Sequence, residues 1–517
     1  MKRKYILAHD LGTTGDKAVL FDVESGQIVG SAFIGYPTSY FSATWAEQDP
    51  SEWWRAFCYA TREVLARTGI SSKEIAVISF SGQMMGCLPV AKNGEPLRAA
   101  IIWADQRATA ETQSLLQKIG LEEIYRITGH RLGPAYSAPK IMWLIKHEPQ
   151  IFERTHKFLQ AKDFIVHRLT HRWVTDYSDA CGTELLDLHH LDWSEKMLAA
   201  AGIPRELLPD IVPSTTVVGE VVQDRAAEAG LIAGIPVVIG GGDGVCATAG
   251  AGVVCPGIGH IYLGSSAWVA GVSERPVLDP QMRTVTWPHL DPRLFSPNGT
   301  MHNAGSSLEW AKETLGSLEI RAAEWLGLNS YDLVELEAER IPPGCKGLLF
   351  LPYLMGERSP YWNPNARGVF LGITRKHTRA HFLRAIYEGV ALNLRTIFLA
   401  LQELGVKFEE MRAIGGGVKS RFWAQILADV FGTPLYITTT PLEATALGAA
   451  MAGAVGIGLL SNLNAAAEKF VRVEKAIEPG PSMEVYTRIH KLFLNSYKAL
   501  RDVFDQLVIE GGVDEPA

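Results

Sequence analysis

A short pattern that occurs twice constrains the fold of this chain more than any other feature. The sequence DLGTT begins at Asp10, and the sequence LGSS begins at Leu263. Each one places a glycine and two hydroxyl residues at the end of an apolar segment that reads as a strand. A repeat with so long a period indicates two related lobes rather than a solenoid. Glycine and alanine cluster near 250–258, so we predict one lobe at 1–252 and a second at 253–517.

Strand and helix patterns alternate along the chain, which predicts an α/β fold. The apolar segments 5–8 and 18–21 flank a GTTG turn and predict a β-hairpin. Buried strands are predicted at 75–80 and at 237–239, the second one stopped by three glycines. Helices are predicted to begin after two N-caps, Asp49, which Pro50 follows, and Thr378.

The composition excludes several classes of protein. The chain has 517 residues and a formal charge of −7, which gives no field for gathering nucleic acid or an anionic membrane. The uncharged segment 444–460 consists largely of Ala and Gly and is shorter than the ~20 apolar residues that span a bilayer, so we predict a helix inside a core. The six cysteines form no C-x-x-C pair, and the apolar stretch after the basic N-terminus is too short for a signal peptide. We therefore expect a soluble, cytoplasmic protein.

Several familiar nucleotide-binding motifs do not occur in the sequence. There is no G-x-x-x-x-G-K-[ST], which excludes a P-loop, and no H-R-D or D-F-G, which excludes a protein kinase. No intact G-x-G-x-x-G follows a strand, so a dinucleotide-dependent dehydrogenase is only a weak alternative.

Four glycine-rich turns remain, and each one ends a predicted strand: 12–15, 240–244, 264–266 and 415–417. Glycine lets a backbone approach an anion closely, and neighbouring N–H and hydroxyl groups can bind phosphate oxygens. Any one of these turns is more often an ordinary change of chain direction. Four together, two of them rich in hydroxyls, favour phosphate binding.

Two acidic residues in these turns are the candidates for chemistry. Asp10 lies at the end of the first strand, and Asp243 follows three glycines directly after a buried strand. Either could be a simple turn former, since Asp commonly accepts local N–H bonds. Alternatively, Asp10 holds a phosphate-bound Mg²⁺ through water, and Asp243 takes a proton from an acceptor hydroxyl. A metal and a positioned carboxylate are what phosphoryl transfer requires.

From residue 5 to about residue 480, the chain resembles the FGGY family of carbohydrate kinases, most closely its xylulokinases. The resemblance rests on nine motifs: DLGTTG (10–15), WAEQDPSEWW (45–54), SGQMMG (81–86), AIIWADQR (100–107), GGGD (240–243), LGSS (263–266), PYLMGERSPYWNPNARGVFLG (352–372), GGGVKSRFWAQILAD (415–429) and EATALGAA (443–450). The resemblance implies two actin-like, ribonuclease-H-like lobes, with ATP and sugar in the cleft between them.

The resemblance also implies roles for individual residues. Asp243 would be the general base, and Asp10 would hold Mg²⁺, through water. The two phosphate hairpins would be formed by Thr13, Thr14, Gly15 and Lys17 with Asp10, and by Gly264, Ser265 and Ser266. The adenosine side would be lined by Gly305, Glu309, Gly416, Gly417 and Ser420. The sugar would contact the turn of Gln83, Met84 and Met85, with Trp103, Asp105 and Arg107 nearby.

One position departs from the family pattern. Xylulokinases usually have Met-His at the sugar-binding turn, whereas this chain has Met84-Met85. We predict ATP- and Mg²⁺-dependent phosphorylation of a primary hydroxyl of a small ketose, with D-xylulose as the first candidate. The alternatives are another pentulose, a tetrulose or a polyol, and, from other classes, a non-transferring ATPase of the same superfold or a sugar-binding module. The expected partner is a small-molecule sugar, and a homodimer is left open.

Overall fold

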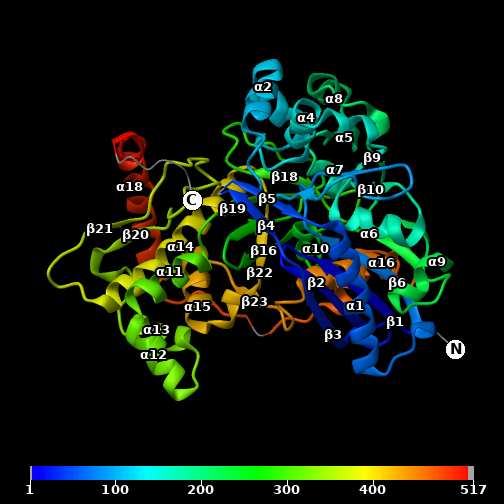
Figure 1. Cartoon of the computed structure of the whole chain (residues 1–517). Helices are drawn as coiled ribbons and strands as arrows, with labels where there is room; N and C mark the ends of the chain where they lie inside the picture. Colours follow the sequence, from blue (N-terminus) through cyan, green and yellow to red (C-terminus); the bar gives the residue numbers. More distant parts are fainter. Residues whose placement is uncertain (1–2, 43, 475, 511–517) are drawn as a thin grey trace.

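Two six-stranded sheets form the centre of the computed structural model, which describes residues 3–42, 44–474 and 476–510 (Figure 1). The first sheet has the order β14-β15-β6-β1-β2-β3 and consists of β1 (Tyr5–Leu11), β2 (Gly15–Asp22), β3 (Ile28–Gly35), β6 (Ile75–Gly82), β14 (Val217–Glu220) and β15 (Pro236–Gly242). The second has the order β18-β19-β17-β16-β22-β23 and consists of β16 (Gly257–Leu263), β17 (Ala267–Ala270), β18 (Val285–Pro288), β19 (Phe295–Met301), β22 (Phe408–Ile414) and β23 (Leu435–Ile437).

Five strands of each sheet share one topology. In the first, β1 pairs antiparallel with β2, β2 pairs antiparallel with β3, and β6 lies parallel to both β1 and β15. In the second, β16, β17, β19, β22 and β23 take the places of β1, β2, β3, β6 and β15, with the same strand directions. The prediction of two related lobes in an α/β fold is therefore confirmed.

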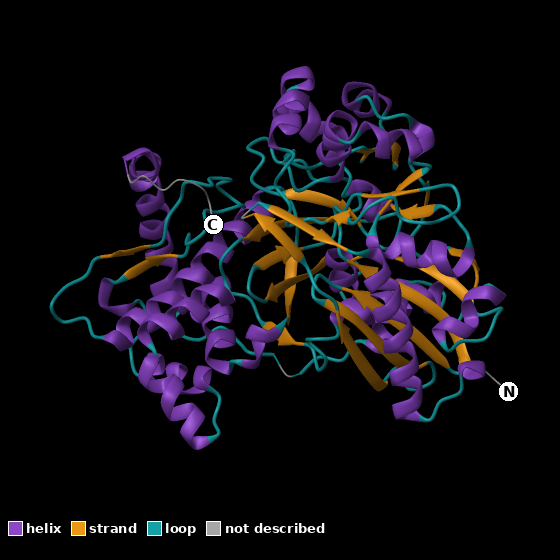
Figure 2. Cartoon of the chain, viewed as in Figure 1, coloured by secondary structure: helices purple, strands orange, loops and turns teal. Residues whose placement is uncertain are grey.

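Helices cover both faces of the sheets (Figure 2). The first sheet is covered on one face by α1 (Pro50–Thr68), α6 (Ala161–Thr170) and α9 (Gln223–Ala229). A third core is built mainly by a separate group of helices, which are α2 (Thr109–Ile119), α3 (Leu121–Thr128), α4 (Ser137–His147), α5 (Pro149–Arg154), α7 (Tyr177–Cys181) and α8 (Glu195–Ala201). The second lobe contains α11 (Gly305–Leu315), α12 (Ser317–Leu326), α13 (Ser330–Glu339), α14 (Arg379–Glu403), α15 (Arg421–Phe431) and α18 (Met483–Glu510).

Short strands form five small sheets outside the two central ones. The pairs are β7 (Leu88–Val90) with β9 (Lys157–Leu159), β10 (Val174–Asp176) with β13 (Asp210–Val212), β11 (Leu186–Asp187) with β12 (Asp192–Trp193), and β20 (Leu349–Leu351) with β21 (Val369–Leu371). The fifth small sheet has three strands, β4 (Ser39–Ser42), β5 (Trp45–Gln48) and β8 (Ala100–Ile101). That three-stranded sheet matters for the site, because Gln48 and the loop after β8 contact the first hairpin.

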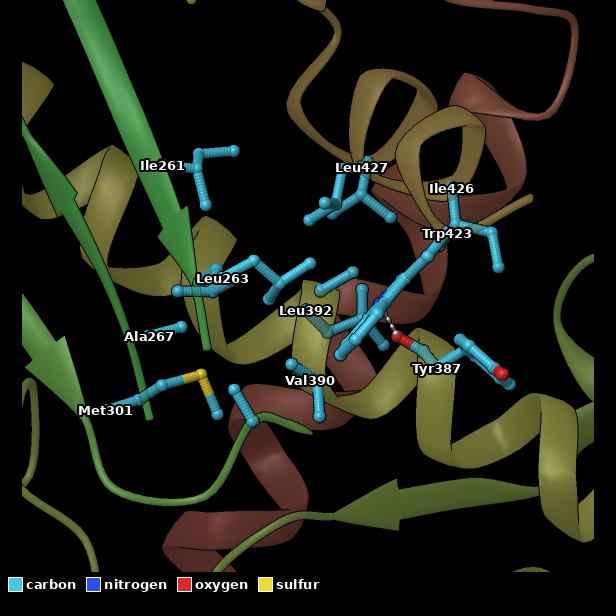
Figure 3. Packing of buried hydrophobic residues seen from close by; sticks show 14 of the residues in the cluster. Ile261, Leu263, Ala267, Met301, Tyr387, Val390, Leu392, Trp423, Ile426 and Leu427 are labelled. Atoms are coloured by element: carbon cyan, nitrogen blue, oxygen red, sulfur yellow. Dashed lines mark hydrogen bonds between the residues drawn. The ribbon is translucent and has the colours of Figure 1, made fainter. Parts of the chain in front are cut away.

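The core of the second lobe anchors the end of β16 (Figure 3). Leu263, the last residue of β16, is fully buried among side chains from α14 and α15. Trp423 of α15 packs in this cluster and donates an Nε1–H hydrogen bond of 3.3 Å to the carbonyl oxygen of Tyr387 on α14. Because Gly264 follows directly, the second glycine turn is attached to a rigid, close-packed core.

Most element predictions are confirmed, and one is wrong. Asp49 and Thr378 are the N-caps of α1 and α14, as predicted. The glycines after Ile239 do not stop the strand, because β15 continues to Gly242 and pairs again with β6 after a shift of register. At the shift, Gly240 has φ 70°, and a Cβ there would lie 1.7 Å from the carbonyl oxygen of Phe80. The glycines therefore form a bulge inside the strand.

The predicted core helix at 444–460 is α16 (Ala444–Gly456), and it is buried as expected. It belongs to the second half of the sequence but packs, with α17 (Leu463–Phe470), on the free face of the first sheet, where its orange ribbon lies beside the blue strands in Figure 1. In turn, α10 (Asp243–Gly250) contributes Ala247 to a cluster under the second sheet. The predicted boundary at 252/253 thus separates the two sheets but not their cores. No helix in the described residues is long and apolar enough to cross a membrane.

Helices α10 and α16 cross in contact at two glycines. A Cβ at Gly250 would lie 1.8 Å from the carbonyl oxygen of Ala444, and one at Gly448 would lie 2.0 Å from that of Cys246. Real side chains do not tolerate such distances, so a Gly250→Ala variant must push the helices apart. We expect a loss of about 1–3 kcal/mol of stability, the usual cost of overpacking a core.

Thermal denaturation checks this expectation against Gly244→Ala. Gly244 lies in the same helix, and its Cβ would meet nothing within 4 Å. Adding a methyl group there removes backbone freedom from the unfolded chain without a clash, which leaves the melting temperature unchanged or raised. Equal melting temperatures for the two variants would contradict the close helix contact.

Candidate active site

The first glycine turn, Gly12-Thr13-Thr14, joins β1 to β2 and is held from three directions. Tyr36 donates a hydrogen bond to the carbonyl oxygen of Gly12. Gln48 donates one of 2.7 Å to the carbonyl oxygen of Thr13, and Trp103 Nε1 donates one of 2.8 Å to Thr13 Oγ1. Thr14 at the tip is exposed. The turn is therefore a fixed loop with an accessible tip, as a phosphate-binding hairpin requires.

The second turn, Gly264-Ser265-Ser266, joins β16 to β17 in the same way. The N–H of Gly305, the first residue of α11, donates a 2.9 Å hydrogen bond to the carbonyl oxygen of Gly264. A Cβ at Gly305 would lie 2.6 Å from that same oxygen, so this contact requires glycine. Ser265 is exposed. The structure thus brings Gly305 together with the second turn.

Asp10 lies in β1 shortly before the first turn begins to bend. Its Oδ1 accepts a 2.9 Å hydrogen bond from Ser81 of β6, and its Oδ2 accepts a 2.5 Å bond from Thr445 of α16. Burial raises the pKa of this carboxyl above its ordinary value. Sequence reasoning assigned no role to Ser81 or Thr445, although both lie in motifs that it singled out, SGQMMG and EATALGAA.

Asp243 is the first residue of α10 and follows the glycine bulge of β15. Its Oδ1 accepts a 2.7 Å hydrogen bond from the N–H of Gly244. Burial raises the pKa of Asp243 to about 7, and the negative charge of Asp10 acts in the same direction. The two predicted catalytic acids, which are far apart in sequence, therefore lie close enough to interact.

The pair fits a cation that arrives with phosphate. Asp10 and Asp243 are partly buried, and two such carboxylates of like charge are unfavourable unless one is protonated or a cation compensates them. Mg²⁺ is commonly held by one or two carboxylates together with waters and substrate phosphates. Within the described ranges no group of three or more His, Cys, Asp or Glu side chains is placed to hold a metal ion. A pair of carboxylates that leaves room for water and phosphate oxygens is a donor set that suits Mg²⁺.

The predicted sugar turn lies against β15, the strand that leads into Asp243. Met84 is buried, and its sulfur would lie 2.4 Å from a Cβ at Gly242, the residue before Asp243. Gln83 donates a 2.8 Å hydrogen bond to Gln48, and its Oε1 has no partner among the described residues although it is buried. Met85 has φ 62° and is partly exposed. The turn thus offers an unpartnered amide oxygen and a thioether next to the segment that leads into Asp243.

Three other predicted site residues form ion pairs with side chains of the protein itself. Asp105 and Arg107 form a buried ion pair with each other at 2.7 Å, and Arg107 also pairs with Glu47 at 2.7 Å. Lys17 points to the start of α16, where it lies 3.7 Å from Glu443. A role for Asp105, Arg107 or Lys17 as a direct ligand therefore stays a prediction.

The predicted adenosine residues lie on α11 and on the loop after β22. Glu309 and Gly416 are exposed, Gly417 packs on Leu263, and Ser420 is the N-cap of α15, accepting a 2.9 Å hydrogen bond from the N–H of Trp423. The second turn follows β16, and the glycine loop follows β22. Because these two strands are parallel neighbours, the turn and the loop lie at the same end of the second sheet. Contact of these residues with adenosine stays a prediction.

Comparison with known proteins gives one consistent result. Residues 5–250 match the N-terminal domain, and residues 259–457 the C-terminal domain, of the FGGY family of carbohydrate kinases. The gluconokinase of Bacillus subtilis is 32% identical over 504 residues, which cover 97% of both chains. The xylulose kinase of the same bacterium is 32% identical over 501 residues, covering 97% of this chain and 98% of that one. The ligand-bound xylulose kinase structure from Lactobacillus acidophilus superimposes with a TM-score of 0.90 at 29% identity, covering 98% of this chain and 100% of the other.

Proposed function

This chain belongs to the FGGY family of carbohydrate kinases, and we propose that it transfers the terminal phosphoryl group of ATP to a primary hydroxyl of a small ketose, D-xylulose first. The observation that carries the proposal is the position of Asp243. Its carboxyl has a pKa raised to about 7 and lies beside Asp10, at the end of the strand that packs on the sugar turn. A general base works best when its pKa is near the operating pH.

The residues divide the reaction between them. Asp243 takes the proton of the sugar hydroxyl, whose oxygen bonds to the γ-phosphorus while the bond from phosphorus to the β–γ bridging oxygen breaks and ADP leaves. The two glycine turns bind phosphate oxygens through backbone N–H and hydroxyl groups. Asp10 would hold Mg²⁺, through water. When bound, Mg²⁺ neutralises charge on the phosphate oxygens, and the rest of the catalysis is alignment.

Gluconate is the second candidate substrate. The gluconokinase and the xylulose kinase of Bacillus subtilis are equally identical to this chain, at 32% each. Both substrates present a terminal primary hydroxyl, so the same base could serve either one. Choice between them depends on the groups that contact the rest of the sugar.

A coupled assay of ADP release tests the proposal across D-xylulose and its stereoisomers, gluconate, a tetrulose and a set of polyols. We expect ADP release to rise strongly with one sugar and the product to carry phosphate on a terminal carbon. ADP release that no sugar stimulates would instead indicate a non-transferring ATPase, and sugar binding without ADP release would indicate a binding module.

Met85 makes a further prediction about the substrate. Its thioether is at best a weak acceptor and never a donor, whereas the histidine usual in xylulokinases can hydrogen-bond a sugar hydroxyl. A desolvated hydroxyl without a partner costs about 1–3 kcal/mol, or roughly ten- to a hundredfold in kcat/KM. We therefore expect Met85→His to gain on D-xylulose relative to its stereoisomers. Histidine is among the residues that tolerate the positive φ of this position.

Steady-state kinetics of Met85→His and Met85→Leu on the same sugar panel decide the point. Leucine keeps the size of the side chain and adds no hydrogen-bonding group, so its relative preference should follow that of the wild type. A uniform loss across the panel in Met85→His, or a wild type that already has a high kcat/KM with D-xylulose, would sink the idea.

A further inference from the structure

The backbone that leads into Asp243 is held by a side chain from another element. The N–H of Gly242, the last residue of β15, donates a 2.9 Å hydrogen bond to Ser178 Oγ of α7. Gly242 is also the N-cap of α10, and this helix has no side-chain cap of its own. The Gly241–Gly242 peptide, directly before Asp243, therefore has its donor bound by Ser178 rather than by its own helix.

Ser178 is in turn held by a buried network of charges. Its hydroxyl donates a 2.6 Å hydrogen bond to Asp176 Oδ2, and Ser214 donates one of 2.9 Å to the same oxygen. The other oxygen of Asp176 lies 2.9 Å from Lys162 Nζ. Lys162 also pairs with two further acids, Asp163 at 2.7 Å and Asp179 at 2.9 Å. All of these residues are buried.

The network fixes the direction in which Ser178 points. Because its O–H is committed to Asp176, a lone pair of its oxygen faces the N–H of Gly242. Asp176 cannot turn away easily, since both of its oxygens are occupied by Lys162, Ser178 and Ser214. A hydrogen-bond acceptor is thus preset at one place next to the base.

The segment that Ser178 contacts has little intrinsic conformational restraint. Three consecutive glycines, 240–242, precede Asp243, and glycine gives a backbone the widest conformational freedom. The ladder to β6 shifts its register between Val238 and Gly241, so regular pairing is interrupted just upstream. Apart from pairing with Gly82 and packing by Met84, the hydrogen bond to Ser178 is the specific polar contact of this peptide.

We propose that Ser178, oriented by Asp176 and Lys162, is a positioning residue that fixes the Gly241–Gly242 peptide, directly before Asp243, and so aims the Asp243 carboxylate at the sugar hydroxyl. This inference rests on the proposed role of Asp243 as the base. Displacement of a reacting group by about 1 Å can cost on the order of a hundredfold in rate, so a distant serine can matter greatly for kcat.

The test compares Ser178→Ala with Ser214→Ala. Both substitutions remove a hydroxyl that donates to the same oxygen of Asp176, but only Ser178 accepts from Gly242. We expect Ser178→Ala to lower kcat by about 10- to 100-fold with KM for ATP changed by less than about twofold. Ser214→Ala should keep kcat within about threefold of the wild type, because the acceptor for Gly242 remains.

Hydrogen exchange supplies a measurement that does not depend on activity. In the folded Ser178→Ala protein, amides of the peptide covering 240–246 should exchange faster than in the wild type and in Ser214→Ala. Unchanged exchange there, or a kcat of Ser178→Ala within about threefold of the wild type, overturns the positioning role. Asp243→Asn separates the two proposals: if it is inactive while Ser178→Ala behaves as wild type, only the positioning inference fails, and if it is active, the proposed base fails.

Discussion

Replacing Asp243 by alanine should abolish the proposed phosphoryl transfer while the protein continues to bind ATP. A positioned base contributes about 10²–10⁴-fold to a reaction of this kind, and no other carboxyl lies at the end of β15 to replace it. Asp243 directly follows β15, the strand that packs on the predicted sugar turn. Its side chain accepts a hydrogen bond from the neighbouring N–H of Gly244. Its loss should therefore leave the nucleotide-binding turns intact.

Initial-rate kinetics and calorimetric titration with ATP measure the two halves of this expectation. Asp243→Asn is the matched variant, since it keeps the size of the side chain and can still accept a hydrogen bond from Gly244 but cannot take a proton. Both variants should lose transfer to the same degree and melt near the wild-type temperature. Retention of more than about a tenth of the wild-type kcat in either one would remove Asp243 from the role of base.

The raised pKa of Asp243 also sets the pH dependence of the wild type. Its folded-state pKa is about 7, above the ordinary value of 3.8, so the carboxyl becomes charged only as the pH rises through 7. A base must be deprotonated to act, and activity should therefore fall on the acid side with a midpoint near 7. For stability, the raised pKa favours the folded protein at low pH, and this contribution is lost progressively as the pH rises from the ordinary pKa through the folded one.

The sequence was sufficient to predict the parts of the site that local chemistry dictates. Strand, glycine and hydroxyl residues in a row specify a hairpin whose tip carries exposed donors, and both hairpins form as predicted. Asp10 and Asp243 could be singled out because each lies next to a glycine-rich segment at the end of a predicted strand. A motif of a few residues can report on its own backbone without knowledge of the rest of the chain.

What the sequence could not show are contacts made between distant segments. Thr445 donates to Asp10 across 435 residues, and α16 packs on the sheet of the other half of the chain. The composition of 444–456 did indicate close packing, because alanine and glycine permit a helix to approach its neighbours closely. The composition does not name the partner, however. Similarly, Ser178 carries no motif, because its role depends on one backbone N–H brought to it by the fold.

Asp10→Asn should fail for a different reason than Asp243→Ala. The amide keeps the shape of the side chain but removes the negative charge that would hold hydrated Mg²⁺ near the phosphates. Charge stabilisation by a metal is worth several kcal/mol in the transition state, which corresponds to roughly 10²–10³-fold in kcat. We expect a loss of this size, a raised Mg²⁺ requirement and unchanged sugar binding. A magnesium titration of the initial rate provides the measurement, and an unchanged titration would contradict the assignment.

Thr445→Val separates the charge of Asp10 from its contact with α16. In the Asp10→Asn variant the amide has a single acceptor oxygen for the two hydroxyls that now donate to the carboxylate, so this substitution also weakens a contact between the halves of the chain. Valine in place of Thr445 has the shape of threonine without the hydroxyl, and it removes that contact while the charge remains. If the Mg²⁺ requirement rises in Asp10→Asn and not in Thr445→Val, the charge is responsible.

Protonation of the base cannot imitate this effect. The charge of Asp10 helps to raise the pKa of Asp243, so its removal lowers that pKa and leaves more of the base deprotonated at neutral pH. If the substitution acted only through the pKa of Asp243, Asp10→Asn should therefore be more active than the wild type below pH 7. The acid limb of its pH–rate profile should move to lower pH. A variant that loses most of its kcat while its acid limb moves in this direction must have lost something other than the base. Such a result would support the role that we propose for Asp10, which is to hold the cation that accompanies the phosphates.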